Sequence, residues 1–196
     1  MSDKKINNRK DILLLLLYSP GISDKVNEEP IRGRTRIVKM LFLFQEEALA
    51  HFRRETNINE ENFYKFFAWN FGPFSRDIYD DLTFFILRGF ITSNETDEEG
   101  LPESAAEWEE WITSSGLESE IDEIREYVEE EFFLTKKGAE FTKELYETLS
   151  NSQKRLLKEF KARTSTVPLR ALLRYVYEKY PEMTEKSQIR ESLIGN

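Results

Sequence analysis

Three aspartates in the middle of the chain have a spacing that could support metal chemistry. Asp77, Asp80 and Asp81 fall at positions i, i+3 and i+4 of the stretch DIYDD, so on a helix their carboxylates share one face. Such a group could hold Mg²⁺ for a metal-dependent nuclease. The alternative is an acidic face in contact with solvent. We favour that alternative because no basic catalytic partner lies nearby in the sequence.

Other side chains that carry out catalysis are scarce. The chain has one histidine, His51, and no cysteine, which excludes a Cys–His pair and a disulfide framework. It contains no glycine-rich phosphate loop. The sequence therefore predicts a protein that is not an enzyme and that uses neither a cofactor nor a metal. The lack of cysteine also fits a reducing cytoplasm, where we expect the protein to reside.

Two basic stretches could bind phosphate. RGRTRIVK gathers four cations near the expected start of a helix, where backbone N–H groups also favour anions: Arg32, Arg34, Arg36 and Lys39. A second stretch, QKRLLKEFKAR, holds Lys154, Arg155, Lys158, Lys161 and Arg163. DNA binding is therefore one hypothesis. The other, which we favour, is that these cations pair with the acidic insertion or are simply in contact with solvent.

Aromatic residues are concentrated around the Gly72-Pro73 dipeptide. Six of them precede it in FYKFFAWNF, and four surround it closely: Trp69, Phe71, Phe74 and Tyr79. Aromatic side chains frequently anchor protein interfaces. We expect two or more of the four to lie in the core and the group to supply contacts to a partner protein.

One segment holds most of the negative charge. Residues 95–131 contain 16 Asp and Glu and a single Arg, a net charge of −15, so the remainder of a chain with net charge −9 is +6. Such an asymmetry predicts an insertion that forms a solvated flap or faces a partner. Trp108 and Trp111 lie at i, i+3 in AAEWEEWI and would form a small apolar stripe on an acidic helix. That stripe would dock onto the body or onto a partner.

The elements that would position these residues follow from apolar spacing and caps. The sequence predicts a buried helix from about Asn8 to Tyr18, whose apolar run is too short to cross a bilayer. A second helix begins near Arg34. The aromatic stretch is a strand or a turn that Gly72-Pro73 breaks, and Ser75 caps the next helix.

The remaining expectations concern the second half of the chain. The helix capped by Ser75 ends near Gly89. The stretches FIT and EFFL form two strands that flank the acidic segment as a wing. Thr135 caps a following helix, and helical patterns continue to Pro181.

Several blocks together resemble a known family. IRGRTRIVKMLFLF, FGPFSRDIYDDLTFFILRGFI and FFLTKKG, in this order, resemble the Panacea domain of SocA-like antitoxins. The closing PLRALLRYVYEKYPEMTEKSQI is similar to the related YwgA-type proteins, and the resemblance covers about Ile12 to Ile189. It implies a mostly helical fold with a winged-helix-like centre and a role in binding a partner protein, often a toxin. The acidic segment departs from the family pattern.

The predicted fold class is mainly α (α+β). Residues 1–150 form a winged-helix-like domain with a small β-wing and an acidic insertion at about 95–131. Residues 151–196 form a C-terminal helical extension on the same core.

The predicted function is a non-enzymatic, cytoplasmic interaction module that binds and masks a partner protein, such as a toxin encoded nearby. It resembles a Panacea-type antitoxin or regulatory adaptor. The alternative is a winged-helix transcriptional regulator that binds DNA. A homo-oligomer is compatible with both, and we expect no membrane association.

Overall fold

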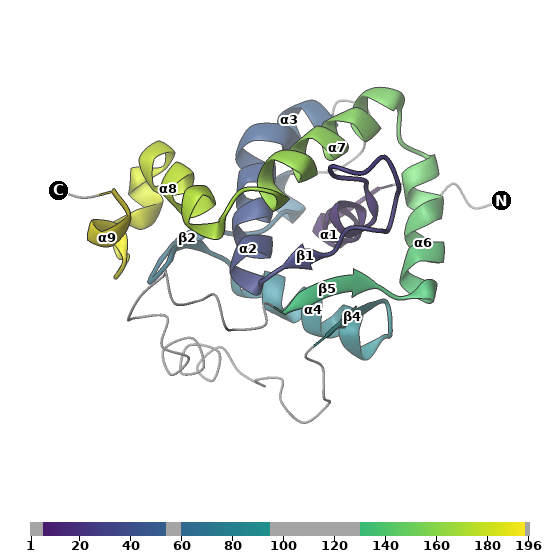
Figure 1. Cartoon of the computed structure of the whole chain (residues 1–196), viewed down its shortest axis with the longest axis horizontal. Helices are drawn as coiled ribbons and strands as arrows, with labels where there is room; N and C mark the ends of the chain where they lie inside the picture. The colour runs from purple at the N-terminus through teal and green to yellow at the C-terminus, as the bar shows by residue number, and fades with distance from the viewer. Residues whose placement is uncertain (1–5, 54–59, 95–129, 195–196) are drawn as a thin grey trace.

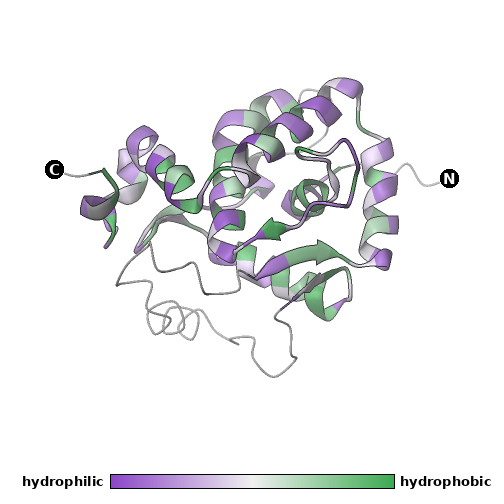
Figure 2. Cartoon of the chain, in the orientation of Figure 1, coloured by the Kyte–Doolittle hydropathy of each residue, from purple (hydrophilic) through white to green (hydrophobic). Residues whose placement is uncertain are grey.

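The computed structural model of the chain describes residues 6–53, 60–94 and 130–194 and places helix α1 (Arg9–Tyr18) at its centre (Figure 1). Every residue of α1 from Asp11 to Tyr18 is buried. A helix that is apolar on all sides must be surrounded by other elements. Figure 2 shows α1 end-on and largely green, enclosed by helices whose outward faces are purple.

The start of α1 is fixed by a capping box. The side-chain oxygen of Asn8 accepts hydrogen bonds from the backbone N–H groups of Lys10 and Asp11. The Asp11 carboxylate in turn accepts the N–H of Asn8 at 3.2 Å. These bonds satisfy donors that the first turn of a helix leaves unpaired. The predicted first helix is confirmed.

Most of the other elements are helices. They are α2 (Arg34–Leu43), the π-helical segment η1 (Phe44–Ala48), α3 (Leu49–Phe52), α6 (Lys136–Glu147), α7 (Asn151–Ser165), α8 (Leu169–Lys179), the 3-10 turn η4 (Pro181–Thr184) and α9 (Arg190–Ile194), with a further 3-10 turn, η3, at Glu60–Asn62. The predicted helix start at Arg34 is confirmed. So is the cap at Thr135, whose hydroxyl accepts the N–H of Gly138 at 3.0 Å.

A small antiparallel sheet covers one side of α1. Its strands are β1 (Ile31–Arg32), β4 (Ile91–Ser93) and β5 (Glu131–Leu134), in the order β1-β5-β4. Ile91 pairs with Leu134 and Ser93 with Phe132. The two predicted strands that flank the acidic segment are therefore confirmed as neighbours. Residues 95–129, with Trp108 and Trp111, lie outside the described residues.

A separate hairpin leads into helix α4 (Arg76–Leu87). It consists of β2 (Phe67–Trp69) and β3 (Gly72–Phe74). The expectation that Gly72-Pro73 breaks a strand is wrong, because both residues belong to β3 and the chain turns just before them. Ser75 occupies the N-cap position of α4 as predicted, although its side chain makes no capping hydrogen bond. Gly89, with φ of 67°, follows the end of α4 as predicted.

The protein is mainly helical with a small antiparallel sheet, as predicted. The C-terminal helices contribute to the same core as α1, through Leu157, Leu172 and Val176. Within the described ranges, no helix is both long enough and apolar enough to cross a membrane.

A buried lysine connects the C-terminal helices to this centre. Lys161 of α7 is fully buried, and its ammonium donates hydrogen bonds to the carbonyl oxygens of Leu17, Ser19 and Glu29 at 2.9, 2.8 and 2.9 Å. The first two of these carbonyls lie at the end of α1, where a helix leaves acceptors unsatisfied. Lys161 therefore closes α1 and holds the loop that follows it.

A buried ion pair closes the base of the acidic segment. Arg34 binds Glu130 through two hydrogen bonds, Nε to Oε2 at 2.6 Å and Nη2 to Oε1 at 2.8 Å, and both side chains are buried. The hydroxyl of Ser93 donates to the same carboxylate at 2.9 Å. Glu130 was expected to belong to the outward-facing insertion. It instead lies inside, because its charge is neutralised by Arg34.

We predict that residues 95–129 can be replaced by a three-residue Gly-Ser-Gly linker without unfolding the body. The reason is that Asn94 and Glu131 are already joined, with the Glu131 N–H donating to the Asn94 side chain at 2.7 Å. The unfolding temperature, measured by circular dichroism, should change by less than about 4 °C, which corresponds to at most ~2 kcal/mol.

The contrasting variant is Glu130→Ala in the intact chain. It leaves Arg34 buried without its partner, so the free energy of unfolding should fall by about 3 kcal/mol or more. If shortening the segment destabilised the protein more than Glu130→Ala did, the anchor would lie in the segment rather than at its base.

Candidate protein-interaction site

Three aromatic rings form one exposed face on the β2–β3 hairpin. Phe67 lies opposite Phe74 in the hairpin register, with ring centroids 5.5 Å apart. The Trp69 ring lies 5.7 Å from that of Phe67 and 6.4 Å from that of Phe74. Phe67 is 45% exposed and Trp69 37% exposed, so the rings contact one another and solvent at once. We call Phe67, Trp69 and Phe74 the aromatic face.

The aromatic face is joined to the core through α4. The Phe74 ring lies 5.4 Å from that of Tyr79, which is buried. Burial raises the pKa of Tyr79 to about 12, so the side chain stays neutral in the physiological range. Tyr79 therefore supports the face from beneath.

The C-terminal segment fixes the tip of the hairpin. The Asn70 carbonyl accepts the N–H of Gln188 at 2.9 Å and the hydroxyl of Ser187 at 3.1 Å. Ser187 is bound in turn to the Tyr177 hydroxyl at 2.6 Å. Gly72, with φ of 83°, lies against the same tyrosine, and a Cβ atom there would come within 2.9 Å of its ring. The hairpin is thus held at its tip by residues far away in the sequence.

The base of the hairpin is held by a buried lysine. Lys39 of α2 is 2% exposed and donates a hydrogen bond to the Pro73 carbonyl at 2.8 Å. Among the described residues this is the one hydrogen-bond acceptor for its ammonium. Burial lowers the pKa of Lys39 to about 7, because a single carbonyl replaces little of the lost hydration.

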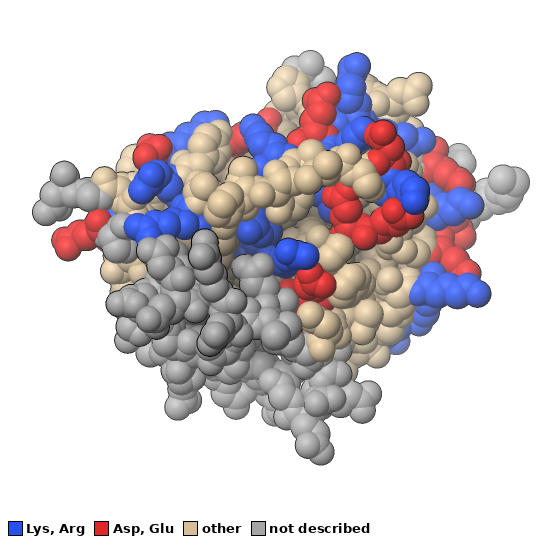
Figure 3. Space-filling model, in the orientation of Figure 1, with Lys and Arg blue, Asp and Glu red and all other residues tan. Residues whose placement is uncertain are grey.

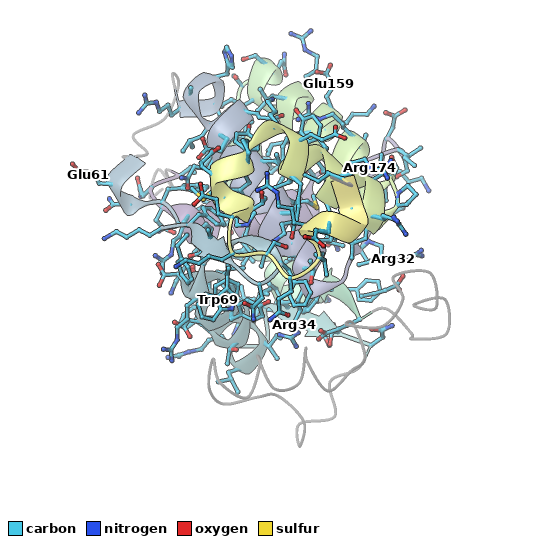
Figure 4. All side chains as sticks on the ribbon, turned by 90° about the vertical axis from the view of Figure 1, so that its left-hand side faces the viewer. Arg32, Arg34, Glu61, Trp69, Glu159 and Arg174 are labelled. Atoms are coloured by element: carbon cyan, nitrogen blue, oxygen red, sulfur yellow. The ribbon has the colours of Figure 1, made fainter. Side chains whose placement is uncertain are left out.

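The structure separates the predicted partner-binding residues into different groups. Trp69 and Phe74 lie on the aromatic face, and Phe71 is half-buried in the turn between the strands. Tyr79 lies in the core and cannot contact a partner directly, which corrects its assignment. Figure 4 shows Trp69 in the lower half of the molecule, below the yellow C-terminal helices, with Glu159 at the opposite end.

Phe67 is a member of the face that sequence reasoning missed. The signal was present, since Phe67 and Trp69 are two residues apart and therefore share one side of a strand.

Three of the four cations predicted to bind phosphate lie inside the protein. Arg34 is engaged by Glu130, and Lys39 by the hairpin. Arg36 is 5% exposed and donates to the carbonyls of Thr164 and Val167 at 2.9 and 2.8 Å. These three are not available to an anion in solution, which corrects the expectation. Arg32 does reach the surface, where it pairs with Glu131 at 2.6 Å.

The second basic stretch is also largely used within the chain. Lys161 is buried, Lys158 pairs with Asp24, and Arg163 pairs with Glu47 at 2.7 Å. Figure 3 shows blue atoms over α8, and blue and red atoms alternating over α7 and the loop after α1. The favoured hypothesis of pairing with the acidic insertion holds for Arg32 and Arg34, whose partners are Glu131 and Glu130. It is wrong for Arg36, Lys39 and Lys161, which are buried and bind backbone carbonyls.

The three aspartates of α4 do not form a metal site. Arg9 of α1 binds Asp77 at 2.6 Å and Asp81 at 2.9 Å, whereas Asp80 is exposed. In the part of the chain that the structure describes, no three Asp, Glu, His or Cys side chains are placed to hold a metal ion. The expectation of one acidic face toward solvent is wrong for Asp81, which is buried, whereas the Asp77 side chain is 39% exposed although it pairs with Arg9. Their charges are neutralised by α1.

One polar cluster had no signal in the sequence. Glu47, on the π-helical segment, accepts hydrogen bonds from Tyr175 at 2.8 Å and Lys179 at 3.0 Å of α8, and from Arg163 at 2.7 Å of α7. Burial would raise the pKa of Glu47, but these hydrogen bonds outweigh it and hold the pKa below its ordinary value. The cluster joins α7 and α8 to the π-helical segment η1, which continues helix α2.

The chain matches no protein-family model, no curated protein and no solved structure.

The burial of Lys39 leads to a prediction about pH. The unfolded chain holds this proton up to the ordinary value of 10.5, whereas the folded protein releases it near pH 7. The unfolded state therefore binds more protons above pH 7, and the free energy of unfolding rises with pH, by at most ~1.4 kcal/mol per pH unit. Below that pH both states are protonated and the slope from Lys39 vanishes.

We expect Lys39→Met to show a smaller rise in stability than the wild-type chain between pH 7 and 9. Urea unfolding at several pH values measures the difference. Lys161, whose pKa burial lowers to about 8, titrates in both proteins and so cancels from the comparison. Equal slopes in the two proteins would show that Lys39 is not the buried group we describe.

Proposed function

We propose that the chain is a non-enzymatic module that binds a partner protein through the aromatic face. The observation that supports this most directly is the exposure of Phe67 and Trp69 in a fixed arrangement, 45% and 37%. Large aromatic side chains left in contact with water, yet already packed against one another, are typical of interface anchors.

The binding energy available from this face is substantial. Covering the exposed parts of the two rings would remove roughly 180 Å² of apolar surface from water, which corresponds to about 4 kcal/mol. Binding would cost little conformational entropy at these side chains, because Lys39, Ser187 and Gln188 already hold the strands that carry them. A rigid aromatic patch of this kind suits the masking of a partner's surface.

The order of the elements supports a winged-helix-like centre. Helix α1, strand β1 and helices α2 and α4 precede β4 and β5, and the sheet order β1-β5-β4 places the last strand between the other two. On this proposal β4 and β5 would form the wing and α4 would take the position of the recognition helix. It is consistent with the resemblance to Panacea-type antitoxins, and we propose an antitoxin-like or regulatory adaptor role on that basis.

DNA binding is the second candidate, favoured by one observation. Two of the three α4 aspartates, Asp77 and Asp81, are paired with Arg9, and Asp81 also contacts Lys10, so the helix is less acidic toward a ligand than its sequence indicates. Against it, Arg34, Arg36 and Lys39 are buried and cannot contact phosphates. We therefore rank protein binding first.

The first proposal predicts that Phe67→Ser with Trp69→Ser abolishes binding to the partner. The natural candidate is the product of a neighbouring gene, co-expressed with the tagged chain and recovered by affinity purification. The wild-type chain should retain it, and the double variant should lose at least about 100-fold in affinity by calorimetry, because about 3 kcal/mol or more of anchor contact is removed.

A matched control is Ile22→Ser, since Ile22 is 73% exposed and lies outside the hairpin. It should bind as the wild type does. Equal binding by the double variant and the control would refute the aromatic face. Salt-sensitive binding of duplex DNA that Arg32→Glu weakens would favour the second candidate.

A further inference from the structure

The far end of α4 carries a second exposed apolar pair. Phe84 is 40% exposed and Leu87 is 78% exposed, the highest value among the large apolar side chains of the described residues. The aromatic face adjoins the start of the same helix. At ~1.5 Å per residue, about 16 Å of helix separate the two ends, so the surfaces are distinct.

Cations surround this second pair. The Lys10 ammonium lies 4.1 Å from the centroid of the Phe84 ring, and the Arg88 guanidinium carbon lies 5.5 Å from it. Lys137, at the start of α6, donates to the Arg88 carbonyl at 2.8 Å. Three elements of the fold therefore bring positive charge to one apolar spot.

Two of these three cations have no carboxylate partner among the described residues. Within the described ranges Arg88 and Lys137 make no ion pair. Lys10 has a contact of 3.5 Å with Asp81, a carboxylate that Arg9 already binds at 2.9 Å. By contrast, Arg32, Arg163 and Lys158 elsewhere on the surface each have a carboxylate partner. The spot thus combines exposed apolar surface with two cations, Arg88 and Lys137, that have no carboxylate partner within the described ranges.

We propose that Phe84, Leu87, Lys10, Arg88 and Lys137 form a docking surface for an acidic peptide segment of another protein, one that carries a large apolar side chain. Its carboxylates would pair with Arg88 and Lys137, and its apolar side chain would cover Leu87 beside the Phe84 ring. Partial desolvation by that side chain would strengthen the charge pairs and the cation–π contacts.

An acidic peptide fits better than an anionic membrane. The chain has a net charge of −9, and residues 95–131 contain 16 Asp and Glu. This segment leaves the sheet after Asn94, at the end of the strand that follows α4. An extended anionic surface would be opposed by the net negative charge of the chain, whereas a short peptide meets the local cations.

Peptide display on the full-length chain tests the proposal, because the protein itself then selects its ligands. Selected peptides that bind the wild type but not Leu87→Ser should be enriched in Asp, Glu and large apolar residues. Leu87→Ser changes a side chain that is 78% exposed, so it should leave the fold intact. Binding of a synthesised winner should weaken at least about tenfold in Leu87→Ser and in Arg88→Glu, and on raising NaCl from about 50 to 500 mM.

Two controls separate this surface from the aromatic face. Arg88→Lys should keep binding of the peptide, and so should Phe67→Ser with Trp69→Ser, even if those variants fail with the partner protein. The proposal is overturned if no peptide discriminates Leu87→Ser from the wild type, or if the discriminating peptides are not acidic. A membrane-binding result would also overturn it. In that result the wild-type chain sediments with phosphatidylserine–phosphatidylcholine vesicles, Leu87→Ser does not, and no peptide binds.

Discussion

The whole arrangement depends on the burial of a helix that has no polar side. Every residue of α1 from Asp11 to Tyr18 is removed from solvent, and β5, α6 and α7 pack against it, while Arg9 joins its first turn to α4. The helix begins at the surface, where Asn8 is exposed, and ends inside the protein. Asn8 and Asp11 satisfy the donors at the start, and Lys161 satisfies carbonyls at the end. The C-terminal part of the chain is thereby tied to the N-terminal helix by a charged side chain inside the core.

Local chemistry explains what could be predicted from the sequence. The first helix, the cap at Thr135 and the glycine after α4 depend on residues within a few positions of one another, and all three were correct. The partners of buried charges could not be predicted, because they are distant in the sequence. Arg34 meets Glu130, and Arg36 meets the carbonyls of Thr164 and Val167. A basic stretch that resembles a phosphate site is therefore used mostly to join elements of the fold.

The same distinction applies to the candidate site. The concentration of aromatic residues near Gly72 was visible, but which rings face outward depends on the hairpin register and on the packing of α8. Register puts Phe67 beside Trp69 and Phe74, and burial removes Tyr79 from the surface. The hairpin is fastened at its base from α2 and at its tip from the C-terminal segment. A surface held in this way is suited to recognition, and its side chains offer no nucleophile or metal ligand.

Photo-crosslinking from the centre of the aromatic face is the most direct test of whether this face binds a partner protein. Trp69 would be replaced by p-benzoylphenylalanine in the native host, with the same replacement at Ile22, which is 73% exposed, as the matched control. If the aromatic face binds a partner protein, irradiation should give one dominant protein adduct from position 69 and none of that mass from position 22. A nucleic-acid adduct at position 69, or the same adducts from both positions, would contradict it.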